Sequence, residues 1–286
     1  ESLPPDSDDQ TFNFAAAPKR VIANTTHPID DVFFLIPEVA PEGYAQESLF
    51  ELLHLAQSEK TIAFLNFGRS TTVISVFQNK KLVFERDIPL GGQDLTRSIM
   101  IMLPKDITPR SSSDLEAAEK LKKESYLPVA KGGEISSDKD LKNQKVFQCF
   151  EGVLGAWLQD ILLSFNYFSE HHGASEISKI YLIGGGANHK NLPDYLSQEL
   201  KIKTEILTLP ASAKLNLKNS LDEKRFRNQF HEYAAAVALA FQPNGYANLT
   251  PIEFRTSHLE RIGIIVFRLM TVLLCVLFVT WFIFLH

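Results

Sequence analysis

The chain has 286 residues, 45% of them hydrophobic and 22% charged, and its formal net charge is −5. This composition predicts a folded protein of one or two domains, and the negative charge argues against a nucleic-acid-binding protein. Cys149 and Cys275 are too far apart in sequence to suggest a metal site or a disulfide framework. Because the first residue is Glu1 rather than Met, we expect the chain to be part of a longer polypeptide.

Residues 1–60 carry only weak structural signals. Residues 1–11 are acidic and rich in proline and serine, which predicts a mobile segment. Residues 12–17 are mostly apolar and predict a short strand, and residues 18–23 predict the start of a helix. Leucines at helical spacing predict a second helix over residues 45–57.

Three successive strands are predicted next. Residues 60–66, 71–78 and 82–88 are either continuously apolar or alternate between β-branched and polar side chains. Residues 68–70 and 79–80 supply the two turns between them. A loop over residues 90–94 then leads to a helix predicted over residues 95–102.

A polar segment follows between residues 104 and 145. Ser113 and Glu116 have the spacing of a capping box, so we predict a helix over residues 113–124. Residues 126–143 predict a solvated loop. Beyond this loop, apolar residues at a spacing of about 3.6 predict a long amphipathic helix over residues 147–168.

The most informative feature is a strand that runs into three glycines. Residues 180–183 are apolar, and Gly184, Gly185 and Gly186 follow them before a helix predicted from about Asn191. Residues without a Cβ atom permit a sharp turn, and they also let a flat or anionic ligand lie against the main chain. A tight turn and a ligand site therefore both fit this segment. A strand over residues 203–208 and an alanine-rich helix over residues 230–241 are predicted downstream.

The last segment predicts a membrane helix. Residues 262–285 are apolar throughout except for Arg268, and their number suffices for the roughly 20 residues that cross a bilayer. A buried core helix is the other interpretation, which the length and all-round hydrophobicity disfavour. Arg255, Arg261 and Arg268 lie on the N-terminal side and Trp281 lies near the far end. The positive-inside rule therefore places the preceding domain in the cytoplasm and the C-terminus across the membrane.

Four segments of the chain occur in an informative order. They are Asn66 to Thr72, Gly91 to Thr96, Ala118 to Lys122 and Gly184 to Ala187. In this order they resemble the second lobe of the actin/Hsp70-like (ribonuclease H-like) nucleotide-binding fold. They are most similar to the PilM family, the cytoplasmic actin-like component of type IV pilus machines. Relatives of that family are the cytoplasmic domain of the type II secretion protein GspL and the division protein FtsA.

The resemblance implies an α/β fold with an incomplete actin-like body and one transmembrane helix. Residues 1–60 would hold the acidic start and a remnant of the first lobe, and residues 61–241 would form the second lobe. Residues 242–261 would be a juxtamembrane linker, and residues 262–285 would be the membrane helix. Within the linker, Asn248, Leu249, Thr250 and Pro251 are similar to the Asn-Leu-hydrophobic-Pro segment that opens the membrane protein PilN. This similarity implies a partner-binding segment beside the anchor.

The resemblance also implies a nucleotide site made of three groups of residues. Gly68, Ser70 and Thr71 would form a phosphate-binding turn. Glu119 and Lys122 would flank the ribose and base, and Gly184, Gly185 and Gly186 would line the adenine pocket. Backbone N–H groups and a hydroxyl of the turn would meet the phosphates.

Two positions depart from the family pattern. Asn66 stands where the family has an Asp that helps to hold Mg²⁺, and a neutral amide is a poorer partner for this cation. Arg69 places a bulky cation in a turn that is normally small. Binding of ATP and Mg²⁺ would also require a first lobe, most of which this chain lacks. We therefore do not expect the chain to hydrolyse nucleotide.

The resemblance implies an inner-membrane platform or scaffold subunit of a type IV pilus or type II secretion-like machine, which is not an enzyme. Expected partners are inner-membrane pilus or secretion proteins, a cytoplasmic assembly ATPase and further copies of the chain, with no nucleic acid. The expected location is the bacterial inner membrane, with a cytoplasmic N-terminal domain and a periplasmic C-terminus. The alternatives are a nucleotide-binding actin-like ATPase and an FtsA-like membrane tether for division proteins. Such tethers attach through an amphipathic helix, whereas residues 262–285 have no polar face.

Overall fold

The computed structural model describes residues 17–30, 39–55, 61–102, 112–128, 138–172, 176–213, 220–241, 248–250 and 252–285. The mobile segment predicted over residues 1–11, and the strand predicted over residues 12–17 except its last residue, lie outside this range. The chain forms two compact units, one of residues 42–242 and one of residues 1–41 together with residues 243–286.

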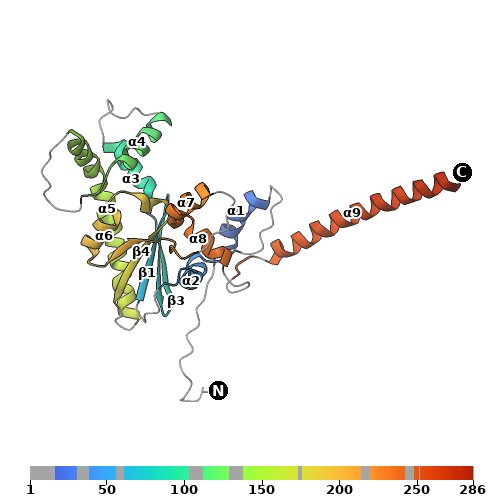
Figure 1. The fold of residues 1–286 in the computed structure, drawn as a ribbon, viewed down its shortest axis with the longest axis horizontal. Coiled ribbons are helices and arrows are strands. Elements are labelled where there is room, and N and C mark those ends of the chain that lie inside the picture. The colour runs from blue at the N-terminus through green and yellow to red at the C-terminus, as the bar shows by residue number, and fades with distance from the viewer. Residues whose placement is uncertain are drawn as a thin grey trace, which may run out of the picture. The chain divides into compact units, whose positions relative to one another are not determined.

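A five-stranded mixed sheet forms the centre of the larger unit (Figure 1). Its order is β3 (Lys81–Ile88), β2 (Thr72–Gln78), β1 (Thr61–Phe67), β4 (Ile177–Ile183) and β5 (Thr204–Ile206). The first three strands are antiparallel neighbours, whereas β4 pairs parallel with both β1 and β5. The three strands predicted before residue 90 are confirmed, and Asn79 and Lys80 form their second turn with φ values of 50° and 67°. Asparagine tolerates this left-handed conformation better than most residues.

One face of the sheet packs against α3 (Gly92–Met102), α4 (Ser112–Glu124), α5 (Asp138–His171) and α6 (Leu192–Leu200). Alternate residues of β1, among them Phe67, point into this core, where the Phe67 ring stacks on Trp157 at 4.7 Å. The Trp157 indole N–H also donates to the Thr72 hydroxyl at 3.0 Å, so its polar atom is satisfied inside the core. This aromatic pair holds α5 against the strand ends at which the cavity described below begins.

The helix α5 is longer than the sequence predicted. It begins at Asp138, so the loop predicted over residues 126–143 is wrong for its last six residues. The polar residues of this first part include the exposed Lys142 and Lys145, whereas Val146 is buried. Asn143 accepts from the Tyr126 N–H at 2.8 Å and donates to the Tyr126 carbonyl at 3.0 Å. The polarity of this segment therefore reflects a solvated helix face rather than a loop.

The other face of the sheet packs against α2 (Glu42–Leu52) and α8 (Phe230–Phe241). Phe50 of α2 lies 5.5 Å from the Phe64 ring and 5.1 Å from the Phe77 ring, which closes this second core. The compact unit consequently begins at Glu42 and includes α2, which the sequence had assigned to the region of residues 1–60. A short polar helix, α7 (Ser220–Asn228), was not predicted because its sequence has almost no apolar stripe.

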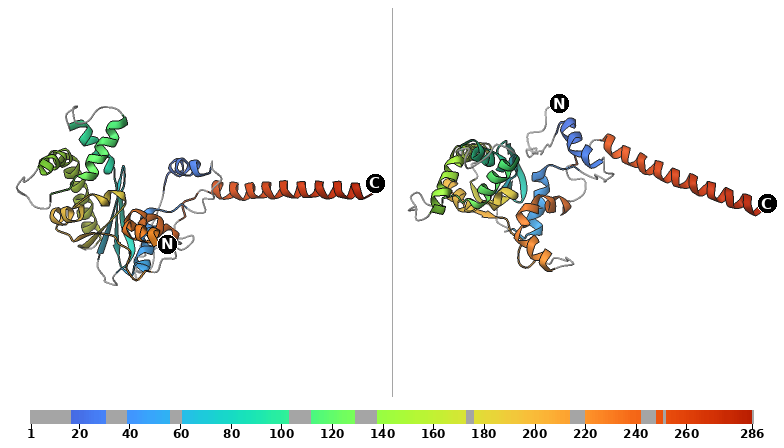
Figure 2. Two further views of the ribbon diagram at one scale, coloured as in Figure 1. Left: turned by 45° about the horizontal axis from the view of Figure 1, so that its top comes forward. Right: turned by 90° about the horizontal axis from the view of Figure 1, so that it is seen from above.

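The smaller unit contains α1 (Lys19–Asp30) and α9 (Ile252–Leu285). The helix α9 is continuous (Figure 2), so residues 252–261 of the predicted linker are helical. Its residues Gly263–Trp281 are long and apolar enough to cross a membrane. The helix α5 meets the same length and composition test, but it buries its apolar side in the core of the sheet.

Two hydrogen bonds join the segment that precedes the larger unit in the sequence to the segment that follows it. The Leu249 N–H donates to the Val39 carbonyl at 2.7 Å, and the Val39 N–H donates to the Thr250 hydroxyl at 2.9 Å. Val39 precedes α2 by three residues, and Thr250 precedes α9 by two. We call this pairing of residue 39 with residues 249 and 250 the clasp. It ties the segments that enter and leave the larger unit to each other, immediately before the candidate membrane helix.

Candidate functional site

A cavity of about 1330 Å³ opens where β1 and β4 end. Because these strands are parallel, their carboxyl ends meet at one edge of the sheet, where ligands of α/β proteins commonly bind. Five of the eight residues predicted for a nucleotide site line this cavity: Gly68, Glu119, Lys122, Gly185 and Gly186. Ser70, Thr71 and Gly184 are not among its lining residues. The two glycine bends and the helical Glu/Lys pair therefore do share one cavity.

The first bend is closed by its own main-chain hydrogen bonds. The Gly68 N–H donates to the Thr71 carbonyl at 3.0 Å, and the Gly68 carbonyl accepts from the Gly92 N–H at 3.0 Å. The Arg69 carbonyl accepts from the Gln93 N–H at 2.7 Å. A Cβ atom on Gly91 would lie 2.6 Å from that same carbonyl, so the loop before α3 can approach only without a side chain. Since the Gly68 N–H is already bonded within the turn, the phosphate-donor role implied for it does not fit this geometry.

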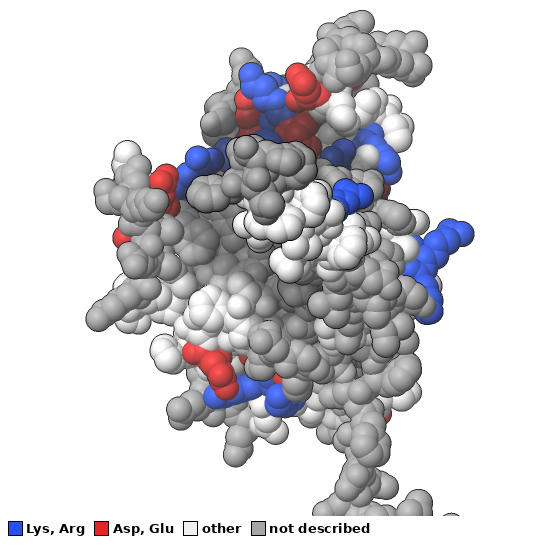
Figure 3. Space-filling view, turned by 90° about the vertical axis from the view of Figure 1, so that its right-hand side faces the viewer, with Lys and Arg blue, Asp and Glu red and all other residues white. Residues whose placement is uncertain are grey.

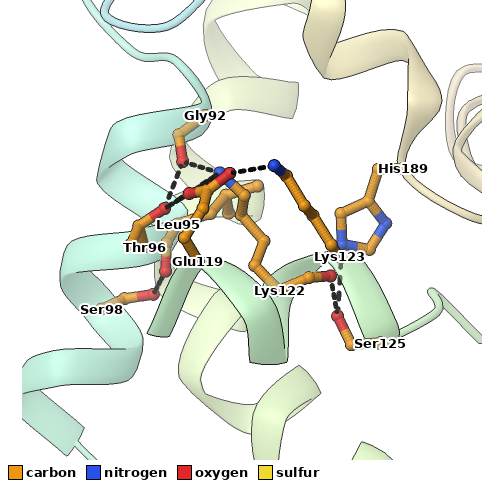
Figure 4. Close-up of polar contacts among 9 residues, drawn as sticks. All are labelled: Gly92, Leu95, Thr96, Ser98, Glu119, Lys122, Lys123, Ser125 and His189. Atoms are coloured by element: carbon orange, nitrogen blue, oxygen red, sulfur yellow. Dashed lines mark hydrogen bonds and ion pairs between the residues drawn. The ribbon is translucent and has the colours of Figure 1, made fainter. Parts of the chain in front are cut away.

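The pair Glu119 and Lys122 on α4 is bonded to α3 in a closed network (Figure 4). The Lys122 ammonium donates to the Gly92 carbonyl at 3.0 Å, the Thr96 hydroxyl at 2.9 Å and a Glu119 carboxylate oxygen at 2.7 Å. The buried Thr96 hydroxyl donates in turn to Glu119 at 2.7 Å. All three ammonium protons are therefore used within the protein.

The pKa of Glu119 responds to two opposing influences. Partial burial alone would raise the pKa of this carboxyl, but the hydrogen bonds from Lys122 and Thr96 outweigh it. The nearby positive charges of Lys122 and Lys123 act in the same direction, so the pKa is lowered overall. Glu119 is consequently a stable anion at neutral pH.

The second bend shows why three glycines follow β4. Gly184 has a φ of +85°, and a Cβ atom there would collide with the Asn66 side chain and lie 2.8 Å from the Phe67 carbonyl. A Cβ atom on Gly186 would lie 2.6 Å from the Phe67 ring. Around Gly185, by contrast, the position of a Cβ atom is open. Two of the glycines thus serve the packing of the 3₁₀ turn η1 (Gly185–Asn188) on the end of β1, and only Gly185 leaves an open backbone surface.

Asn66 at the end of β1 belongs to a second polar cluster, on the α2 side of the sheet. Its amide donates to a Glu42 carboxylate oxygen at 2.6 Å, and the buried Gln46 amide donates to the same oxygen at 2.6 Å. Burial raises the pKa of Glu42 despite these bonds, and the negative charge of Asp87 on β3 adds to the effect. Nothing in the sequence had singled out Glu42, because its partner lies 24 residues further along the chain.

These positions do not fit a Mg²⁺ ion. Asn66 is the residue that stands in place of the expected metal-linked carboxylate, and its amide is held by Glu42 and packed against Gly184. Among the described residues, no group of three or more His, Cys, Asp or Glu side chains is arranged to hold a metal ion. The carboxylate of Glu119 is already engaged by Lys122.

His189 lines the cavity beside α4 and is neutral at physiological pH. Burial, together with the positive charges of Lys122 and Lys190, lowers its pKa to about 4. Its Nε2 lies 3.4 Å from the Ser125 hydroxyl, which itself donates to the Lys122 carbonyl at 2.7 Å. No carboxylate among the described residues orients this ring, so the pair lacks the arrangement of a nucleophilic dyad.

Charges of both signs surround the cavity. On the face of the molecule seen in Figure 3, acidic and basic side chains lie mixed together at the top. Along α4 this mixture is explained by pairs within the helix, such as Lys120 with Glu124 at 4.0 Å and Lys123 with Glu119 at 3.8 Å. The cavity therefore has no strong net charge of either sign.

The sheet has three antiparallel strands, β3, β2 and β1, followed by the parallel strands β4 and β5, and a cavity opens at the ends of β1 and β4. This arrangement is that of an actin-like lobe of the ribonuclease H-like type. The sequence matches the family described as type IV pilus assembly protein PilM over residues 7–244. The chain therefore belongs to the PilM family.

The chain is also similar to several known proteins. The chain is similar to a solved chain of the PilM-PilN type IV pilus biogenesis complex, with a TM-score of 0.56 and 19% identity. That match covers 78% of this chain and 58% of the other, so the chain spans little more than half of that relative. The ethanolamine utilization protein EutJ from Carboxydothermus hydrogenoformans matches with a TM-score of 0.47 and 14% identity, over 84% of this chain and 64% of its own. Cell division protein FtsA of Bacillus subtilis (strain 168) is 40% identical over 72 residues, which are 24% of this chain and 14% of FtsA.

Proposed function

We propose that the chain is a membrane-anchored scaffold of a type IV pilus machine or a related type II secretion system. Its actin-like lobe docks cytoplasmic partners, including the assembly ATPase, and α9 connects the lobe to the inner membrane. Movements of the motor then reach the membrane through this chain, without nucleotide turnover by the lobe itself. Membership of the PilM family and the candidate span in α9 support this proposal.

The observation that carries the scaffold function is the clasp before α9. Residue 250, two residues before α9, is hydrogen-bonded to residue 39 within the smaller unit. A pulling force on α9 can therefore pass to the larger unit along both chain segments that connect to it, the one that precedes α2 as well as the one that follows α8. A mechanical connection of this kind suits a protein that transmits movement.

The proposal that the lobe is not an enzyme is supported by the state of its cavity. The Lys122 ammonium and the Gly68 N–H are occupied by partners within the protein, and the residues near β1 do not fit Mg²⁺. Phosphoryl transfer depends on such groups to stabilise developing charge. Purified protein is therefore expected to release no phosphate from ATP above background. Turnover that is abolished by Glu119→Gln, a substitution in the cavity lining, would replace this proposal with the alternative of an actin-like ATPase.

The orientation of the anchor follows from the arginines at its N-terminal end. Arg268 lies near the start of the apolar span, and Arg255 and Arg261 precede it in sequence. We therefore place the lobe in the cytoplasm and the C-terminus in the periplasm. Protease protection of tags at the two ends, in membrane vesicles of known orientation, tests this topology.

The segment Asn248, Leu249 and Thr250 is our candidate for contact with an inner-membrane pilus protein, with Pro251 outside the described residues. In the structure it is hydrogen-bonded to the backbone of Val39 of the same chain, and a partner's backbone could make the same bonds. Further copies of the chain are the other expected partner of this surface.

The experiment uses the membrane-anchored chain and the clasp. Leu249→Pro removes the N–H that donates to Val39, whereas Leu249→Ala keeps it. We expect the proline variant to remain in the membrane but to lose pilus assembly and co-purification with the assembly ATPase, and the alanine variant to retain both. If the proline variant is folded and still supports full pilus assembly, the clasp is not required for the function. Assembly by a chain lacking α9 would overturn the scaffold proposal itself.

A further inference from the structure

The strand β3 forms one edge of the sheet. It pairs with β2 along one side, and no strand of the described part of the chain pairs with its other side. The start of this outer side is covered, because the Leu82 N–H donates to the Glu47 side chain of α2 at 2.8 Å. Residues 83–87, which we call the β3 edge, follow this contact. Backbone groups at a sheet edge can pair with another extended chain.

An apolar surface borders the β3 edge on the α5 face of the sheet. Leu163 and Tyr167 lie one turn apart on α5, and each of the two residues is 51% exposed. The Tyr167 ring lies 5.9 Å from the ring of Phe84 on β3, so this surface continues onto the strand. Arg86 adds no free charge here, because its guanidinium pairs with Asp160 of α5 at 3.4 Å. Apolar side chains of an added strand would cover exposed carbon surface on this face.

The other face of the β3 edge carries negative charge. Glu85 accepts a hydrogen bond from the Gly43 backbone of α2, and Asp87, two residues further along the strand, lies on the same face. Burial raises the pKa of Glu85, and the negative charges of Glu42 and Asp87 add to this effect. None of these three carboxylates forms an ion pair with a lysine or arginine that the structure describes. A basic side chain would therefore meet uncompensated negative charge on this face.

The two faces together match a strand of alternating composition. Successive side chains of a strand point to opposite faces of a sheet. In a strand beside β3, one set of side chains would meet Leu163 and Tyr167, and the other set would meet Glu85 and Asp87. Apolar residues suit the first set. Lysine or arginine suits the second, since opposite charges on neighbouring strands stabilise their pairing.

A second copy of β3 does not suit this edge. Its own Glu85 and Asp87 would bring further carboxylates to the acidic face, and like charges on neighbouring strands destabilise pairing. Charged residues on an edge strand commonly protect a protein against such pairing of identical strands. The same charges make the edge selective for a strand of opposite charge.

From these observations we infer that the β3 edge binds an extended segment of a partner protein, in which apolar residues alternate with lysine or arginine. The segment adds a further strand to the sheet. The inference rests on the proposed scaffold function, to which it adds a place and a recognition chemistry for docking. The residues of the β3 edge belong neither to the clasp nor to the cavity lining, so the surface can be altered by itself.

The test uses the whole chain in nanodiscs of zwitterionic lipid. The probe is a labelled peptide of about nine residues, an ordinary strand length, in which lysine alternates with valine and phenylalanine. A peptide of the same composition with all its lysines at one end is the control, and empty nanodiscs give the background. We expect the alternating peptide to bind about tenfold more tightly than the control peptide in fluorescence anisotropy. Hydrogen exchange of the backbone amides of residues 83–87 should slow when it binds.

Substitutions on the two faces separate the two parts of the recognition. Asp87→Lys replaces an attraction by a repulsion and Leu163→Asp places a charge on the apolar side, so each should weaken binding about fivefold or more. Asp87→Asn removes the charge with little change of shape and should lie between the parent and Asp87→Lys. Glu199→Lys on α6 and Leu239→Asp on α8, at exposed positions outside the β3 edge, are the matched controls and should bind like the parent chain.

Four results would overturn the inference. They are equal binding of the two peptides, unchanged affinity of both Asp87 variants when these are folded, slowed exchange only outside residues 83–87, and self-association of the parent chain through the β3 amides. The last result would identify a second copy as the occupant. A chain that binds no peptide but needs α9 for pilus assembly loses this inference and keeps the scaffold function. A chain that binds the peptide but assembles pili without α9 loses only the scaffold function.

Discussion

Two carboxylates beside the ends of the same sheet have opposite environments. Glu119 meets an ammonium group and a hydroxyl, and its pKa is lowered. Glu42 accepts hydrogen bonds from the neutral amides of Asn66 and Gln46, the negative charges of Asp87 and Glu85 lie nearby, and burial raises its pKa. We refer to the first group as the paired cluster and the second as the acidic cluster.

The difference shows what each cluster can contribute. The paired cluster joins α3 to α4 with a matched charge, so it stabilises the wall of the cavity at neutral pH. The acidic cluster joins α2 to the end of β1 but retains a net negative charge that is costly when partly buried. The first is therefore expected to act as a structural support, and the second to store electrostatic strain at the start of α2.

The largest effect is expected where the acidic cluster touches the second bend. Gly184→Ala places a methyl group against Asn66 and imposes a positive φ on an L-residue, so we expect a loss of about 2–4 kcal/mol in the free energy of unfolding. Gly185→Ala is the matched control, since the space around it is open, and it should stay within about 0.5 kcal/mol of the parent. Denaturant unfolding measures both. Equal effects of the two substitutions would mean that the bend does not need its left-handed glycine.

The next effect comes from the paired cluster. Lys122→Met leaves Glu119 without its ammonium partner and the buried Thr96 hydroxyl with one bond fewer, so a loss of about 2–3 kcal/mol is expected. Lys120→Met removes an exposed lysine that lies 4.0 Å from Glu124, and it should cost about 0.5 kcal/mol or less. If the two methionine variants unfold at the same denaturant concentration, the network between α4 and α3 stabilises the fold no more than a surface ion pair does.

The sequence predicts one of these clusters and not the other, for a physical reason. Glu119 and Lys122 are one turn apart on a single helix, so local spacing already places them together. Glu42 meets Asn66 only because α2 packs across the end of β1, and no local pattern encodes that contact. The same limit explains why the first part of α5 was predicted to be a loop: its residues are polar, and only its packing shows that it is helical. The strands and glycine bends were predictable because alternating polarity and runs of glycine are local features of the sequence. Which of the glycines is needed for packing depends on Asn66 and Phe67 of the neighbouring strand β1, and the local sequence does not show this.

A smaller effect is expected when the paired cluster keeps its shape and loses its charge. Glu119→Gln retains an oxygen for Lys122 but not the anion, so we expect a loss of about 1 kcal/mol at pH 7. The lowered pKa of Glu119 means that its contribution is present above its ordinary value of 4.5 and is lost as the pH falls through the folded-state pKa. Unfolding curves of parent and variant should therefore converge in acid. A difference that stays constant with pH would show that the loss is one of packing rather than charge.

The smallest effect should have the opposite sign and comes from the acidic cluster. Glu42→Gln keeps an oxygen that can accept from Asn66 and Gln46 and removes a charge that burial disfavours, so the free energy of unfolding should rise by about 1 kcal/mol or less at pH 7. Because the folded-state pKa of Glu42 is raised, the parent recovers this stability when the carboxyl is protonated, and the advantage of the variant disappears as the pH falls toward 4.5. Glu51→Gln, at an exposed position of the same helix, is the control and should show no gain at pH 7. Two Glu→Gln substitutions beside one sheet would thus shift stability in opposite directions at neutral pH and converge in acid, and a gain for both would mean that Lys122 does not stabilise the charge of Glu119.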